Sequence, residues 1–181
     1  MSFKQLIALT LVLAGTFSVA GCQSARKALN MNTSIVVEFT AAENINPDGD
    51  DRPSPVVVHV FELADDRQFS REDFLSLYEG AAARLGKDLI DTVVLKEITP
   101  GETRSEVIPL TTEVKYIGLM AEFIQYRDAE ALLVLPVLEH NQNVVSVSID
   151  ENRIAIAEET SDDSAATPHK QLRNDRSSPQ R

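Results

Sequence analysis

Apolar and polar residues alternate along much of the chain between residues 34 and 157, a period of two that is typical of β-strands with one buried face. In the segment 34–40, SIVVEFT, the residues Ile35, Val37 and Phe39 fall on one face. Similar β-branched and apolar segments occur at 56–63, 89–98, 103–110, 116–123, 131–139, 144–149 and 154–157. Pro136 favours an edge or a bulge for its segment, because it has no amide hydrogen to donate. About eight short strands predict a mostly β fold, a β-sandwich.

One segment has a helical period instead. The stretch 70–86, SREDFLSLYEGAAARLG, places its apolar residues three and four positions apart. Ser70 and Asp73 have the spacing of a capping box with Asp in place of Glu or Gln, and Gly86 suits a helix end. The pattern therefore predicts one helix, inserted among the strands, with a stripe that packs in the core. The stripe consists of Phe74, Leu77, Tyr78, Ala81, Ala82 and Leu85.

The connection between the first two strands is unusually long. It reads NINPDGDDRPSP over 44–55, with three prolines and three aspartates. A β-hairpin connection usually has about two to five residues, and proline fixes its own φ and restricts the residue before it. The composition predicts a loop that samples few conformations, kept in solvent by its aspartates, with Arg52 free to pair with a carboxylate of a partner.

An ordered loop loses less entropy when it docks on a partner. The hypothesis is therefore that this loop projects from the sandwich and binds another protein, although a solvated excursion without a task is the simpler alternative. The candidate binding residues are Asn44, Ile45, Asn46, Pro47, Asp48, Gly49, Asp50, Asp51, Arg52, Pro53 and Ser54.

The N-terminus has the pattern of a bacterial lipoprotein signal. Lys4 precedes an apolar run over 6–20 that is too short for a transmembrane helix, and VAGC, 19–22, follows it. Cys22 is the only cysteine of the chain and stands where a lipobox requires it. The alternative is an ordinary signal peptide with a cysteine at this position by chance. The pattern predicts that Cys22 receives a diacylglycerol and becomes the mature N-terminus. Gln23 in place of Asp favours transfer to the outer membrane, by the sorting rule familiar for enterobacterial lipoproteins.

These segments divide the chain into four parts. We expect a signal peptide over 1–21, a tether over 22–33, the β-sandwich domain over 34–157 and a polar, disordered tail over 158–181.

Charge and composition exclude several classes of function. The chain of 181 residues has 17 Lys and Arg against 28 Asp and Glu, a formal charge of −11, which opposes binding to nucleic acid. One cysteine allows neither an internal disulfide nor a cysteine zinc site. Asp48, Asp50 and Asp51 lack the spacing of an EF-hand, and no serine lies in a G-x-S-x-G elbow. We therefore expect no enzyme, no metal and no cofactor other than the covalent lipid on Cys22.

The ordered motifs resemble a known family, the outer-membrane lipoprotein of the bacterial type VI secretion system called TssJ, also SciN or VasD. The resemblance rests on the lipobox at Cys22 and on four stretches in the order of the family. These are NPDGDDRPSPVVVHVFEL at 46–63, FSREDFLSLYEGAAARLGKDL at 69–89, PGE at 100–102 and KYIGLMAEF at 115–123.

The resemblance implies a transthyretin-like β-sandwich with an added helical element, held at the inner face of the outer membrane. It implies a partner as well, the periplasmic C-terminal domain of the inner-membrane protein TssM, in a complex that also contains TssL. The loop over 41–55 corresponds to a TssM contact of the family. Two other classes remain open: a periplasmic lipoprotein that binds a small ligand on a concave face of the sandwich, and an envelope hydrolase.

Overall fold

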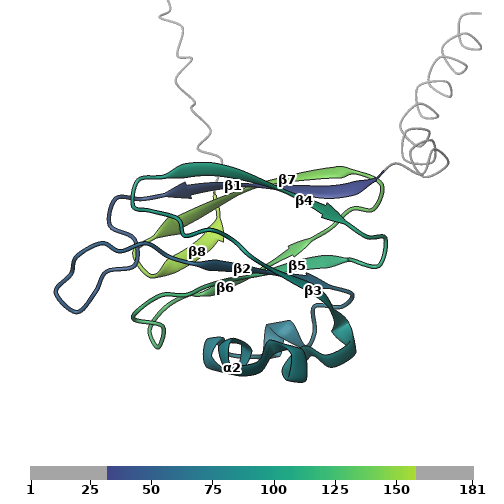
Figure 1. Cartoon of the computed structure of the whole chain (residues 1–181), viewed down its shortest axis with the longest axis horizontal. Helices are drawn as coiled ribbons and strands as arrows, with labels where there is room; N and C mark the ends of the chain where they lie inside the picture. Colours follow the sequence, from purple (N-terminus) through teal and green to yellow (C-terminus); the bar gives the residue numbers. More distant parts are fainter. Residues whose placement is uncertain (1–31, 158–181) are drawn as a thin grey trace, which may run out of the picture.

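A computed structural model describes residues 32–157, and within them the chain forms a sandwich of two four-stranded sheets (Figure 1). Sheet I has the strand order β4-β1-β7-β8, and sheet II has the order β3-β2-β5-β6. The strands of sheet I are β1 (Thr33–Ala41), β4 (Thr103–Leu110), β7 (Gln142–Asp150) and β8 (Arg153–Ile156). Those of sheet II are β2 (Val58–Leu63), β3 (Leu89–Val94), β5 (Tyr116–Ala121) and β6 (Leu132–Pro136). The predicted mostly β sandwich of eight strands is confirmed.

The alternation in β1 fixes its orientation in sheet I. Ile35, Val37 and Phe39 point between the sheets and are buried in the main core. β1 pairs antiparallel with β4 and parallel with β7, so it lies in the middle of its sheet. Since sequence-neighbouring strands usually join as antiparallel hairpins, the parallel pairing joins two distant parts of the chain and closes the domain.

Several strands differ from the predicted bounds. The predicted strand 89–98 ends at Val94, because the chain then leaves sheet II and crosses toward sheet I. Arg104 of β4 holds this crossing segment by donating from Nη2 to the carbonyl of Lys96, at 2.6 Å, and from Nη1 to that of Glu97, at 3.1 Å. β6 is shorter than predicted and ends at Pro136, on the edge of sheet II, as proline favours.

The helix α2 (Phe74–Leu85) is shorter than the predicted span 70–86, and the predicted capping box is wrong. Ser70 lies in a 3₁₀ turn, η1 (Phe69–Arg71), and Glu72 is extended, so the helix begins later. Asp73 is the N-cap, and its carboxylate accepts a hydrogen bond from the amide of Ser76 at 2.8 Å. Gly86, with φ of 54°, ends the helix as expected and begins a second 3₁₀ turn, η2 (Gly86–Asp88).

α2 covers the outer face of sheet II, whereas no described element covers the outer face of sheet I (Figure 1). A second core lies beneath the helix and is formed by Phe61, Leu63, Phe69, Leu77, Leu85 and Met120. The ring of Phe69 lies directly on β5, where a Cβ on Gly118 would come within 2.6 Å of it. Glycine at this strand position therefore allows the ring to contact the backbone.

The predicted apolar stripe of the helix packs only in part. Leu77 and Leu85 are buried and Phe74 is half-buried, but Tyr78 and Ala82 are exposed. Gly80 has non-helical dihedral angles, φ −171° and ψ 55°, so the helical period is interrupted between the two buried leucines. The prediction that Tyr78 packs in the core is therefore wrong.

Leu77→Ala is expected to lower the free energy of unfolding by about 2–5 kcal/mol, because it removes a fully buried side chain and leaves a cavity. Leu75→Ala is the matched control, since Leu75 lies on the same helix and is 42% exposed. Chemical denaturation of both variants measures the effect. Equal losses for the two would contradict the packing described for α2.

Candidate partner-binding site

The base of the loop between β1 and β2 is buried, which corrects the prediction that all of 44–54 projects. Ile45 and Asn46 are both inaccessible to solvent or nearly so. Asn46 Nδ2 donates to the carbonyl of Pro55 at 2.7 Å, and its Oδ1 accepts the amide of Ile124 at the same distance. The backbone amide of Asn46 donates to the carbonyl of Glu151 at 2.7 Å. Asn46 therefore connects three loops at one end of the sandwich, and its φ of 48° is one that asparagine tolerates.

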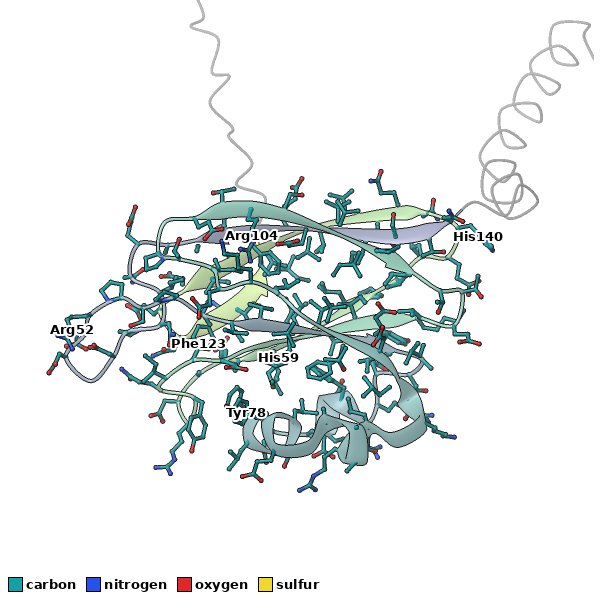
Figure 2. All side chains as sticks on the ribbon, viewed as in Figure 1. Arg52, His59, Tyr78, Arg104, Phe123 and His140 are labelled. Atoms are coloured by element: carbon teal, nitrogen blue, oxygen red, sulfur yellow. The ribbon has the colours of Figure 1, made fainter. Side chains whose placement is uncertain are left out.

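The part that projects is the tip, defined here as residues 48–52, which extends beyond the strands at the end of the sandwich where Arg52 is labelled (Figure 2). Asp48 organises it: Oδ1 accepts the amides of Asp50 and Arg52, at 2.8 and 3.1 Å. The backbone closes the same turn, because the Asp48 amide donates to the carbonyl of Arg52 at 2.9 Å. Prolines alone were expected to restrict the loop, but the structure adds this side-chain network.

Arg52 is already paired within the tip. Its guanidinium contacts Asp48 at 2.8 Å and Asp50 at 3.1 Å, although the side chain remains 71% exposed. The expectation that Arg52 is free for a partner carboxylate therefore does not describe the unbound protein. With three aspartates and one arginine, the tip presents an excess of negative charge.

The pKa of Asp48 is lowered from its ordinary value of 3.8, first by the hydrogen bond from the Arg52 side chain and then by the amides of Arg52 and Asp50. A carboxyl whose folded pKa is depressed stabilises its structure above the ordinary value, and this contribution is lost as pH falls through the folded pKa. The tip is therefore expected to keep its turn at neutral pH and to open in acid below 3.8.

In Arg52→Ala, the pKa of Asp48 is expected to rise toward 3.8, as measured by NMR titration of the carboxyl carbon. Asp65 is the internal control, because its pKa is lowered in the same way by Arg67, elsewhere on the surface. An Asp48 pKa that stays the same without the guanidinium would show that the ion pair does not organise the tip.

The tip and the start of β1 lie at opposite ends of the sandwich. Figure 2 labels Arg52 at one end and His140 at the other. The amide of His140 donates to Oγ1 of Thr33, the first residue of β1, at 2.9 Å. The chain therefore enters the domain at the end farthest from the tip.

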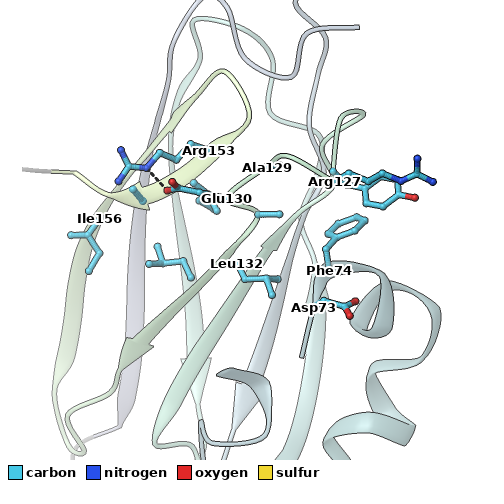
Figure 3. Close-up of a pocket in the computed structure, with 13 residues that line it drawn as sticks. Asp73, Phe74, Arg127, Ala129, Glu130, Leu132, Arg153 and Ile156 are labelled. Carbon is cyan, nitrogen blue, oxygen red and sulfur yellow. Dashed lines mark ion pairs between the residues drawn. The ribbon is translucent and has the colours of Figure 1, made fainter. Parts of the chain in front are cut away.

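An open groove of about 670 Å³ lies between the edges of β6 and β8 (Figure 3). Its apolar lining includes Phe74, Leu132 and Ile156, and Glu130 and Arg153 stand at the wall. These two charged groups pair with each other at 2.7 Å, so neither is left to orient a ligand. The volume is within the range of small-molecule sites, about 300–1,000 Å³, but such sites also use convergent polar groups that fix the ligand.

In the described part of the chain, His59 Nε2 and Glu122 Oε1 form a half-buried pair, and neither residue lines the groove. Glu62 is the buried carboxylate in the same part of the chain, and its pKa is raised by burial and then by the charge of Asp91. It does not line the groove. Across 32–157, no cluster of three or more His, Cys, Asp or Glu side chains is arranged to hold a metal ion. No helix in the same range is long and apolar enough to cross a membrane.

Other predictions fall outside residues 32–157. These are the lipid attachment at Cys22, the signal peptide over 1–21, nearly all of the tether over 22–33 and the tail over 158–181. Sequence reasoning also missed the segment 122–128, which the structure ties to the base of the loop. One feature of its sequence, EFIQYRD, could have indicated a packed segment: apolar and aromatic residues continue after the end of β5.

An eight-stranded sandwich with one helix on the outer face of one sheet, and an ordered loop projecting from one end, describes the class of fold. The family model of the type VI secretion lipoprotein, T6SS-SciN, described by the names VasD, EvfM and TssJ, matches residues 33–152. The chain therefore belongs to the type VI secretion lipoprotein family, as the sequence motifs indicated. Comparison with curated protein sequences gave no match.

Solved structures share the fold. The crystal structure of the type VI lipoprotein TssJ1 from Pseudomonas aeruginosa is 26% identical, with a TM-score of 0.65 over 70% of this chain and 95% of that one. Serratia marcescens Lip, described as a membrane-bound component of the type VI secretion system, is 21% identical, with a TM-score of 0.64 over 71% and 98%. A chain in the structure described as the TssM C-terminal domain from EAEC is 21% identical, with a TM-score of 0.58 over 70% and 98%.

Proposed function

We propose that this protein is an outer-membrane lipoprotein of the type VI secretion membrane complex, and that its loop tip binds the periplasmic domain of a TssM-like inner-membrane protein. A lipid on Cys22 would hold it at the periplasmic face of the outer membrane, and TssL would join the complex indirectly. Membership of the type VI secretion lipoprotein family supports the assignment to this secretion system. The similarity to a chain in a structure described as the TssM C-terminal domain supports the choice of partner.

The observation that carries the proposal is the position of the tip relative to the start of the domain. Cys22 precedes Thr33 by eleven residues, which span at most about 40 Å when fully extended. The nine residues of β1 add about 30 Å before the loop begins. Because the chain enters at the opposite end, a lipid-anchored domain can direct the tip away from the membrane and into the periplasm.

The proposed role is structural rather than enzymatic. Glu130 and Arg153 at the wall of the groove pair with each other, and the projecting tip is held by its own hydrogen bonds. An ordered tip suits docking, because little entropy is lost on binding. Binding of a small ligand in the groove is the alternative: of the other charged residues that line it, Asp73 caps α2 and Arg127 lies over the ring of Tyr126.

Affinity purification of the lipidated protein from the cell envelope tests the proposal. The TssM-like protein is expected to co-purify with the wild-type chain, and mass spectrometry identifies it. Recovery of the lipoprotein without this inner-membrane protein, under conditions that preserve other envelope complexes, would contradict the proposed function.

A further inference from the structure

Beside the loop, three aromatic rings stack into a ladder that is open to solvent. The rings of Phe74 and Tyr78 are 5.6 Å apart between centroids, and those of Phe74 and Tyr126 are 5.2 Å apart. The guanidinium of Arg127 lies 5.7 Å from the centroid of the Tyr126 ring. Tyr78 is 57% exposed, and the nearby Ile124 is 52% exposed. We call the exposed surface of Leu75, Tyr78, Ile124, Tyr126 and Arg127 the aromatic patch.

The patch is hollowed rather than flat. A depression of about 250 Å³ lies between α2 and the segment after β5, lined by Phe74, Leu75, Tyr78, Glu122, Phe123 and Tyr126. A second depression, of about 300 Å³, is lined by residues 124–128. The two depressions are adjacent, because Tyr126 lines both. The first lies below the range of small-molecule sites and the second at its lower limit, so each has room for one or two side chains of another protein.

Hydrogen bonds connect the patch to the loop. The amide of Ile124 donates to Oδ1 of Asn46 at 2.7 Å, at the base of the loop. Gln125 Nε2 donates to the carbonyl of Pro47 at 3.1 Å, directly before the tip. A partner that seats on the tip therefore meets the segment 122–128 next, and the buried Asn46 fixes the spacing between them.

The composition of the tip shows why a second surface is needed. A stable interface buries about 800 Å² on each partner, and its binding energy is concentrated in a few Tyr, Trp and Arg side chains packed at its centre. The tip consists of three aspartates, a glycine and one arginine that is already paired within it. It offers charge but no apolar anchor. The aromatic patch supplies two tyrosines, two aliphatic side chains and an arginine next to it.

We infer that the tip and the aromatic patch form one binding surface, in which the tip is the polar half and the patch is the apolar half. This inference rests on the proposed function. The partner then has two complementary features. Basic side chains face Asp50 and Asp51 of the tip, and an apolar or aromatic side chain enters the depression beside Tyr78. The tip sets the orientation and the rate of association, and the patch determines how long the complex lasts.

Titration of the purified, lipidated chain in detergent with the periplasmic domain of the TssM-like partner tests the inference. Tyr78→Ala and Ile124→Ala are each expected to raise Kd by roughly tenfold, as central interface residues do. Val107→Ala and Val144→Ala are matched controls, because these valines are 64% and 61% exposed on the bare outer face of sheet I. They are expected to bind like the wild type. Unchanged thermal unfolding of all four variants shows that the fold is intact.

A tip-deleted variant distinguishes failure of the inference from failure of the proposed function. If deletion of the tip abolishes binding while Tyr78→Ala and Ile124→Ala bind like the wild type, the inference is wrong and the proposed function stands. If the tip-deleted variant also binds normally, the proposed function fails and the inference fails with it. If the patch variants change only self-association, measured by sedimentation, the patch receives a second copy of the chain and the inference is overturned.

Discussion

Replacement of residues 48–52 by a two-residue Asn-Gly turn is expected to abolish binding of the TssM-like domain and leave the sandwich folded. The replacement is geometrically feasible, because the Asp48 amide already donates to the carbonyl of Arg52 at 2.9 Å and the ends of the excised segment are close together. It spares Ile45 and Asn46, which are buried and hold the base of the loop. A longer deletion would remove these residues and confuse loss of binding with loss of stability.

The measurement is the affinity for the purified periplasmic domain, together with thermal unfolding and detection of the lipid. The expected result is no detectable binding with an unfolding temperature close to that of the wild type. Asp65→Asn is the control, because it removes another surface aspartate that pairs with an arginine but lies outside the tip. Wild-type affinity of the shortened variant would exclude the tip as the binding element.

Cys22→Ser is expected to abolish acylation and the attachment of the protein to the outer membrane. The serine hydroxyl cannot form the thioether that attaches the diacylglycerol, and stable anchoring takes two or more acyl chains. The sandwich is expected to fold as before, because Cys22 precedes it by eleven residues. Fractionation of the envelope measures the result, and wild-type levels of the variant in the outer membrane would show that Cys22 is not the anchor.

Gln23→Asp separates anchoring from sorting. This variant keeps the cysteine, so it is expected to remain lipidated and membrane-bound, but at the inner membrane. If it reaches the outer membrane in the same amount as the wild type, residue 23 does not decide the location of this protein.

Local pattern predicted the strands well, because alternation in segments such as 34–40 depends only on which face is buried. Local pattern fails where a contact with a distant part of the chain determines the structure. The start of α2 is set by the 3₁₀ turn at Phe69–Arg71, and the ring of Phe69 is placed by Gly118, nearly fifty residues later. The parallel pairing of β1 with β7 is likewise a long-range contact that no local period indicates.

The site shows the same division between local and distant causes. Length and prolines identified the loop, but its base depends on Asn46, whose partners are at Pro55, Ile124 and Glu151. Tyr78 is exposed although the helical period predicted its burial, and the backbone two residues later, at Gly80, is not helical. The aromatic patch is formed jointly by the helix and the segment 122–128, so the pattern of neither segment alone indicates it.

Site-specific photocrosslinking in living cells tests the central claim most directly. A photoreactive residue at Gly49 occupies open space in the tip, since a Cβ there has no neighbour within 4 Å. The same residue at Leu138, which is exposed and lies two positions before His140 at the opposite end, is the control. A crosslink to the TssM-like protein is expected from Gly49 and none from Leu138. A crosslink from Leu138 but not from Gly49 would contradict the central claim.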